Sequence, residues 1–165
     1  IEEILTAPFS YAEIIASYLI SSVLRAVIVG GGVYVIALFF TETNMHHLGL
    51  FLFYVIAVSA VFSLAGLLVG LWSETFEQLS IPTTFVIMPL TFLGGLFNSV
   101  SMIPERFQWF IRLNPFFYFV DGIRYSMIGV SESNKTVGIF LIAALMAGLG
   151  AWVWILFKRG YKIRT

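Results

Sequence analysis

The chain has 165 residues, of which 59% are hydrophobic, 17% aromatic and only 11% charged. Soluble domains normally carry about a quarter charged residues, so most of this chain must contact lipid rather than water. Nine basic residues balance nine acidic ones, which leaves no basic field for nucleic acid, and the lack of cysteine excludes disulfides and thiolate chemistry. The first residue is Ile, and no signal peptide follows it, so we expect a fragment that begins inside a longer protein.

Four segments are long and apolar enough to cross a membrane, which takes about 20 residues of helix. They are residues 16–40, 48–72, 80–98 and 136–157. The last three contain no charged residue and no histidine, whereas Arg25 interrupts the first. The sequence therefore predicts an all-α integral membrane protein with four transmembrane helices.

Small residues within these segments indicate where helices approach one another. Consecutive glycines occupy positions 30–32, and small residues recur at four-residue spacing at Gly66 and Gly70 and at Ala144 and Gly148. Packing in lipid relies on such residues, so we expect helix contacts here, above all at the three glycines.

Arg25 is the candidate intramembrane charge. If its helix enters the membrane near Ser17, the arginine lies about 12 Å deep, where an ionisable residue is costly and often functional. Its long stem also permits the guanidinium to reach the headgroups. The sequence leaves a functional role and this structural one equally open.

Two prolines lie in the third predicted span. Pro82 is expected in the first turn, where a missing N–H costs little, whereas Pro89 should kink the helix. Kinked helices serve both as static packing devices and as gating elements, and the sequence does not distinguish the two.

Residues 101–129 are strongly aromatic, and they are too short and too broken to span. Pro104 resembles a helix start, an aromatic stretch that includes Trp109 follows, and Asn114-Pro115 should end that helix. A second helix, 116–128, carries Asp121 and Arg124 at a spacing at which they could pair. Irregular backbone at membrane depth needs a cover of protein or water, so these half-helices suggest a re-entrant lid over a pathway. An interfacial aromatic belt is the alternative.

The orientation follows from the basic residues. Four basic residues directly after the last span favour a cytoplasmic C-terminus, namely Lys158, Arg159, Lys162 and Arg164. An even number of spans then puts the N-terminal segment and the turn at residues 73–78 on the same side. The four basic residues between 99 and 135 argue against this orientation, but the tail cluster is favoured because it directly abuts a span.

The chain lacks the parts of an enzyme. His46 and His47 are adjacent in a short loop, which is far more typical of a polar interfacial loop than of a metal site. The sequence has neither a G-x-S-x-G elbow nor a Gly-Lys-Ser/Thr phosphate loop. We therefore expect no catalytic, cofactor or metal site in this chain.

The opening residues 1–8, Ile-Glu-Glu-Ile-Leu-Thr-Ala-Pro, resemble the E-E-L-L-x-A-P signature of ABC-2 type permeases, the membrane subunits of ATP-binding cassette exporters. They depart from it only at Ile4. The run from Pro89 to Phe97, then Pro104, Leu113-Asn114-Pro115 and residues 121–124, is similar to the C-terminal signature of that family. The order and spacing of these motifs cover essentially the whole chain.

The resemblance implies a six-span permease of which this chain holds spans three to six. It implies a cytoplasmic coupling helix at residues 1–13 that docks on an ATPase, and a second, smaller contact at the turn after residue 72. By this resemblance the coupling residues are Glu2, Glu3, Ala7, Pro8, Glu74, Phe76 and Glu77. The outer re-entrant gate would comprise Pro104, Trp109, Asn114, Pro115, Asp121 and Arg124.

The resemblance also implies partners. These are a separate ABC ATPase subunit that binds ATP and Mg²⁺, a second permease copy that makes a homodimer, and the lipid bilayer of the bacterial inner membrane. An ATP-independent channel or secondary transporter is the rival hypothesis, although it leaves the opening signature unexplained. The substrate cannot be read from the sequence, but an aromatic, weakly charged interior suggests an amphiphile.

Overall fold

A computed structural model of the chain describes residues 10–40, 45–96 and 100–159, and the regular structure in these ranges is entirely helical. Four helical stretches are long and apolar enough to cross a membrane: α2 (Tyr11–Phe40), α3 (Leu48–Trp72), the run Phe76–Leu96, and α8 (Lys135–Lys158). The prediction of an all-α chain with four membrane-length helices is confirmed. The first and third helices begin about five residues earlier than expected from the sequence.

The early start of α2 has a local cause. Ser10 and Glu13 form a capping box, in which the backbone N–H of Ser10 donates to the Glu13 carboxylate at 2.7 Å and the N–H of Glu13 donates to Ser10 Oγ at 3.3 Å. Residues 11–13, expected to belong to the coupling helix, are therefore the first turn of α2. Residues 1–9 lie outside the described residues.

The third membrane-length helix changes its hydrogen-bond pattern along its length. It consists of α4 (Phe76–Pro82), the π-helical η1 (Thr83–Ile87), α5 (Met88–Thr91) and the π-helical η2 (Phe92–Leu96). Within it, the N–H of Met88 donates to the carbonyl of Thr83, five residues back. Pro89 has no N–H to donate, and such gaps in the α-helical ladder are where π turns and kinks occur. Because the helix begins at Phe76, Pro82 closes α4 instead of lying in the first turn as predicted.

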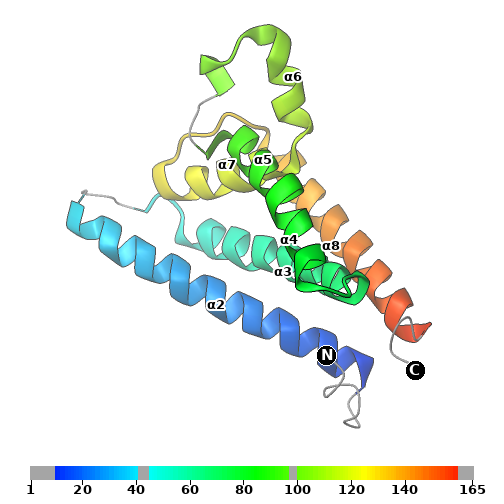
Figure 1. Ribbon diagram of the computed structural model, residues 1–165. Helices are drawn as coiled ribbons and strands as arrows, with labels where there is room; N and C mark the ends of the chain where they lie inside the picture. The colour runs from blue at the N-terminus through cyan, green and yellow to red at the C-terminus, as the bar shows by residue number, and fades with distance from the viewer. Residues whose placement is uncertain (1–9, 41–44, 97–99, 160–165) are drawn as a thin grey trace.

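Aromatic and aliphatic side chains join three helix ends at one end of the molecule. The first turn of α2 meets the last turns of α3 and α8 there, and the rings of Tyr11 and Phe157 are 5.9 Å apart. The buried core at this end comprises Ile14, Leu64, Leu67, Leu71, Val153 and Phe157. Both ends of the described chain therefore lie on one side of the helices (Figure 1), as an even number of crossings requires.

A second core lies further along the bundle, where α3, α7 (Pro115–Ile128) and α8 meet. It is built from the buried residues Tyr54, Ala57, Val61, Phe119 and Ile142. In Figure 1, α7 lies near α3 and α8, whereas α6 (Glu105–Leu113) projects away from the other helices.

The glycines expected to mediate helix packing do not do so among the described residues. A Cβ added at Gly30, Gly31, Gly32, Gly66 or Gly148 would meet no described neighbour within 4 Å. The prediction of packing at the three consecutive glycines is wrong within this part of the chain. The close approaches occur instead at Gly94 and Gly122, where α7 packs onto its neighbours.

Candidate functional site

Two short helices separate the third membrane-length helix from the fourth. After a single 3₁₀ turn, η3 (Val100–Met102), α6 begins directly after Pro104 and ends at Asn114, and Pro115 opens α7. The predicted helix start at Pro104 and the predicted break at Asn114-Pro115 are both confirmed. The fixed φ of proline suits the first turn of α7, and the residue before it is pushed out of helical geometry.

Asn114 joins the break between α6 and α7 to the third membrane-length helix. Its side chain is 4% exposed. Its Nδ2 donates to the carbonyl of Leu90 at 2.6 Å, and its Oδ1 accepts from the N–H of Phe116 at 3.0 Å. The same side chain therefore caps α7 and ties its start to the carbonyl of the residue that follows Pro89 in the third membrane-length helix.

The start of α7 packs against two consecutive glycines at the end of that helix. A Cβ at Gly94 would lie 3.0 Å from Cβ of Phe116 and 3.2 Å from its carbonyl carbon, so a larger residue would push these two backbones apart by a few tenths of an ångström. Gly95 has a φ of 84°, and its carbonyl accepts a hydrogen bond from the Arg124 guanidinium. Pro89, these glycines and α7 thus form one packed unit.

Asp121 fastens α7 to the loop that leads into α8. The carboxylate is 1% exposed. It accepts from the N–H groups of Glu132 and Ser133 at 2.9 and 3.0 Å, and from the hydroxyls of Ser131 and Ser133. These four donors satisfy both oxygens of a buried charge.

Arg124 and Asp121 therefore have separate partners, and the predicted pairing between them is wrong. Arg124 forms an ion pair with Glu132 at 3.8 Å, and the other oxygen of Glu132 accepts from the N–H of Val100 at 2.7 Å. Helical spacing brought the two side chains within reach, but both bind segments distant in sequence. The result is a network linking the end of the third helix, the turn before α6, α7 and the loop before α8.

The two short helices differ in burial. Five residues along α7 are buried, namely Phe117, Phe119, Asp121, Gly122 and Ser126, whereas α6 buries only Ile111 and exposes its aromatic side chains. Trp109 is 60% exposed. An amphipathic helix with exposed aromatic residues is typical of a membrane interface. The environment of α6 therefore differs from that of α7, which packs inside the bundle.

The loop before α3 makes a contact that sequence reasoning missed. The N–H groups of His46 and His47 donate to the carbonyls of Met127 and Ser126, at 3.1 and 2.9 Å, in the last turn of α7. The ring of His46 also packs edge-on against Tyr125. Neighbouring histidines in a polar loop carry no signal for this role, because the bonds are made by the backbone.

The opposite end of the bundle holds the turn between α3 and α4. The side-chain oxygen of Thr75 caps α4 by accepting a hydrogen bond from the N–H of Gln78. Around this cap, the side chains of Glu74, Phe76 and Glu77 are exposed. Phe76 is 90% exposed. Among the other predicted coupling residues, Glu2, Glu3, Ala7 and Pro8 lie outside the described residues, but the chain enters α2 at this same end.

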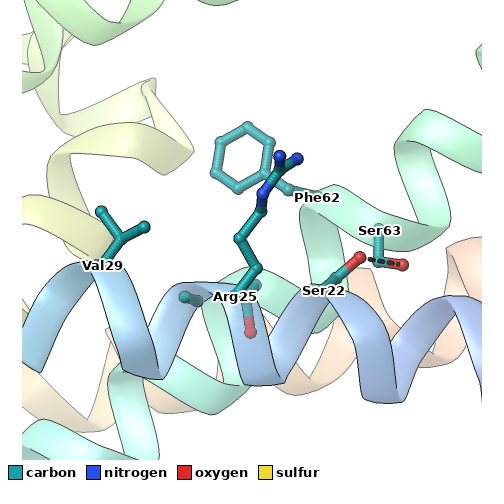
Figure 2. A pocket seen from close by; sticks show the side chains of 7 residues that line it. Ser22, Arg25, Val29, Phe62 and Ser63 are labelled. Atoms are coloured by element: carbon teal, nitrogen blue, oxygen red, sulfur yellow. Dashed lines mark hydrogen bonds between the residues drawn. The ribbon is translucent and has the colours of Figure 1, made fainter.

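Arg25 is the fifteenth of the 30 residues of α2. Its side chain leaves the ribbon of α2 on the side of the groove that α3 also lines (Figure 2). It lines an open groove of about 390 Å³ between the two helices together with Ser22, Ala26, Val29, Ser59, Phe62 and Ser63. The remaining predicted residues, Pro104 and Pro115, bound α6 and α7 as described above.

Comparison with known proteins decides the family. The family model described as "ABC-2 type transporter" matches residues 1–128. The chain belongs to the ABC-2 type transporter family. Together with its four apolar helices, this membership makes it a multi-pass membrane protein.

Curated relatives of this ABC-2 chain include the "Inner membrane transport permease YadH" of Escherichia coli (strain K12), which is 34% identical over 165 residues. That match covers 100% of this chain and 64% of the relative. The "Nodulation protein J" of Rhizobium leguminosarum bv. viciae is 26% identical over 142 residues, which cover 84% of this chain and 53% of that relative. The matches thus span between about half and two thirds of the length of these relatives, and no solved structure matches the chain.

Proposed function

We propose that this chain is part of the permease subunit of an exporter, forming a membrane pathway that a separate ABC ATPase drives. The observation that carries the proposal is the family match over residues 1–128, which includes the opening signature. The permease itself would have no catalytic site, and ATP and Mg²⁺ would bind to the ATPase. The chain would hold spans three to six of six, in a bacterial inner membrane.

The ATPase would dock at the end of the bundle where α2 begins. Three features support this position. The signature residues directly precede α2, the exposed turn with Glu74, Phe76 and Glu77 lies at the α3–α4 junction, and basic residues follow α8 at the same end. By the positive-inside rule that end would face the cytoplasm, where ATP is available.

The segment 101–129 would form the outer re-entrant gate. The packing of α7 against α3, α8 and the Gly94-Gly95 break supports a buried half-helix at membrane depth. The exposed aromatic face of α6 supports an interfacial position for the other half. In this mechanism α7 transmits tilting of the third helix, and α6 moves with it at the membrane surface.

A second permease copy would complete the pathway. The described helices expose large apolar faces, including Phe39, Phe40 and Phe85, which are each more than 70% exposed. The missing spans and the partner copy, as well as lipid, would cover these faces. A homodimer would then place two copies of the gate about one central pathway.

The test is co-purification of the full-length permease with its ATPase, followed by the double substitution Glu2→Gln and Glu3→Gln. We expect the wild-type complex to couple ATP hydrolysis to export. The double variant should insert normally but lose most of the coupling, because it lacks the charges that would meet basic groups on the ATPase. Transport measured in proteoliposomes and ATPase assays check both results.

The matched control is Glu105→Gln, a charge removed from α6 at the opposite end, which should leave coupling unchanged. Unchanged transport in the double variant would contradict the coupling assignment. If no ATPase co-purifies and export proceeds without ATP, the chain is instead an ATP-independent channel or secondary transporter.

A further inference from the structure

The groove that contains Arg25 lies between two helices that cross the membrane. It has an apolar wall from Ala26, Val29 and Phe62 and a polar wall from Arg25 and the serines at 22, 59 and 63. Arg25 is at the midpoint of a helix of 30 residues, which at about 1.5 Å per residue is longer than the hydrocarbon core is thick. Its side chain leaves the ribbon of α2 on the side of this groove (Figure 2).

The charge of Arg25 has no counter-charge among the described parts of the membrane-length helices. The only acidic residues in these helices are Glu13 and Glu77, both in first turns. Glu13 is engaged with Ser10, and twelve residues of helix, about 18 Å, separate it from Arg25. Arginines within membranes pair with an anion or with backbone carbonyls, face water, or extend to the headgroups. No carboxylate of the described membrane-length helices is placed to pair with Arg25, so any anion that binds it would come from outside them.

Hydroxyl groups accompany the guanidinium. The Ser22 and Ser63 hydroxyls are hydrogen-bonded to each other at 3.0 Å, which uses one of their two hydrogens and leaves the second to donate. Ser59 Oγ donates its hydrogen to the carbonyl of Ile56 at 2.9 Å, so this serine lines the groove without offering it a donor. The guanidinium contributes five further N–H donors. The groove is therefore lined by the guanidinium N–H donors and by one free serine hydrogen, which a group with several acceptor oxygens could use.

Exposed apolar side chains of α2 flank Arg25 in the sequence, outside the residues that line the groove itself. Along α2 the large side chains on either side of Arg25 are exposed, including Ile20, Leu24, Ile28 and Val33. A ligand that carried its charge to Arg25 and its hydrocarbon along these side chains would match both the donors and the apolar surface.

We propose that this groove binds the anionic headgroup of an amphiphile and so selects anionic amphiphiles for export. The inference rests on the proposed function, because it assumes that the groove faces the export pathway. Arg25 holds the headgroup charge, the Ser22–Ser63 pair donates to a further oxygen, and the apolar faces of α2 and α3 hold the chain.

The test is a binding titration of the detergent-purified full-length permease, followed by native mass spectrometry. The probes are phosphatidylglycerol, phosphatidylcholine with the same chains, and inorganic phosphate. We expect phosphatidylglycerol to bind the wild type more tightly than the other two. Arg25→Gln should weaken the binding of phosphatidylglycerol by about tenfold or more and leave the binding of phosphatidylcholine unchanged. Arg25→Lys should retain part of the preference and Ser63→Ala should reduce it moderately.

The control is Arg112→Gln, which removes an exposed arginine from α6 and should leave the binding of all three probes unchanged. Equal binding of phosphatidylglycerol by the wild type and the Arg25→Gln variant would overturn the proposal. Inorganic phosphate that binds as tightly as the lipid, with the same dependence on Arg25, would show a site for free anions and would also overturn it.

Thermal unfolding distinguishes a ligand from a protein carboxylate supplied by another span or a second copy. Removing the arginine of a protein ion pair would leave a buried carboxylate unpaired and lower the melting temperature sharply. The proposal expects the melting temperature of the Arg25→Gln variant to stay near that of the wild type when no lipid is added. Because binding is measured without ATP, a negative result here leaves the coupling experiments unaffected.

Discussion

Replacing Gly122 with alanine should destabilise the bundle more than any other single methyl group added to it. A Cβ at this position would lie 2.1 Å from Cε1 of Tyr54 and 2.3 Å from its Cζ, and Tyr54 is 3% exposed in the core between α3, α7 and α8. Neither the ring nor the helices can move without disturbing their neighbours. Overpacking a core costs about 1–3 kcal/mol, and this contact is near or above the upper limit.

Thermal unfolding of the purified full-length protein in detergent, with size-exclusion chromatography, measures this effect. Gly66→Ala is the matched control, because the same methyl group meets no described neighbour within 4 Å and alanine favours helix by about 1 kcal/mol. Tyr54→Ala should partly rescue Gly122→Ala by opening the required space. Equal stability of the Gly122→Ala and Gly66→Ala variants would contradict the packing of α7 against α3.

Replacing Asp121 with alanine should detach the loop before α8 from α7. The substitution leaves the N–H groups of Glu132 and Ser133 without their acceptor at a partly buried site, and each such loss costs about 1–3 kcal/mol. The two serine hydroxyls can rotate to other acceptors. We expect a loss of about 3 kcal/mol or more in the free energy of unfolding, and faster proteolysis near residues 131–133.

Asp121→Asn provides the graded comparison. The amide keeps the shape of the side chain and one acceptor oxygen, but its NH₂ group would face the N–H or O–H donors that the second carboxylate oxygen now accepts from. Its loss should be smaller than that of alanine. Glu105→Gln changes an exposed carboxylate in the first turn of α6 and should alter stability by no more than a few tenths of a kcal/mol. An Asp121→Ala variant as stable as Glu105→Gln would rule out the buried network.

Local rules were sufficient to predict the helices from the sequence. Length and hydropathy gave the four membrane-length helices, and the geometry of proline gave the start of α6 and the break at Asn114. The early start of α2 was missed, although Ser10 and Glu13 form a recognisable capping box. Such errors of a few residues arise because a polar first turn looks like loop when hydropathy alone is read.

Contacts between distant segments could not be predicted in the same way. Spacing showed that Asp121 and Arg124 share a helix face, but their partners lie on other segments, at residues 131–133 and at Gly95 and Glu132. The three consecutive glycines were more conspicuous than Gly122, yet they have no described neighbour within 4 Å of an added Cβ, whereas Gly122 is pressed against the ring of Tyr54. A glycine motif indicates that close approach is possible, whereas the partner depends on the tertiary fold.

Arg25 shows the same division between position and role. The sequence placed a charge inside a span and left snorkelling and function equally open. The structure adds the direction of the side chain, on the side of the groove that α3 also lines, and the serines that line the groove with it. These observations motivate an anion site, which the binding experiments must test.

Site-directed cross-linking to the ATPase tests the central claim most directly. The chain has no cysteine, so single cysteines can be placed at Phe76, in the turn beside the start of α2, and at Trp109 on α6, in full-length permease otherwise free of cysteine. Both positions are exposed, at 90% and 60%, and they lie at opposite ends of the bundle. Our account predicts that Phe76→Cys cross-links to the co-purified ATPase and that Trp109→Cys does not. A cross-link from position 109, or none from position 76 in an intact complex, would contradict it.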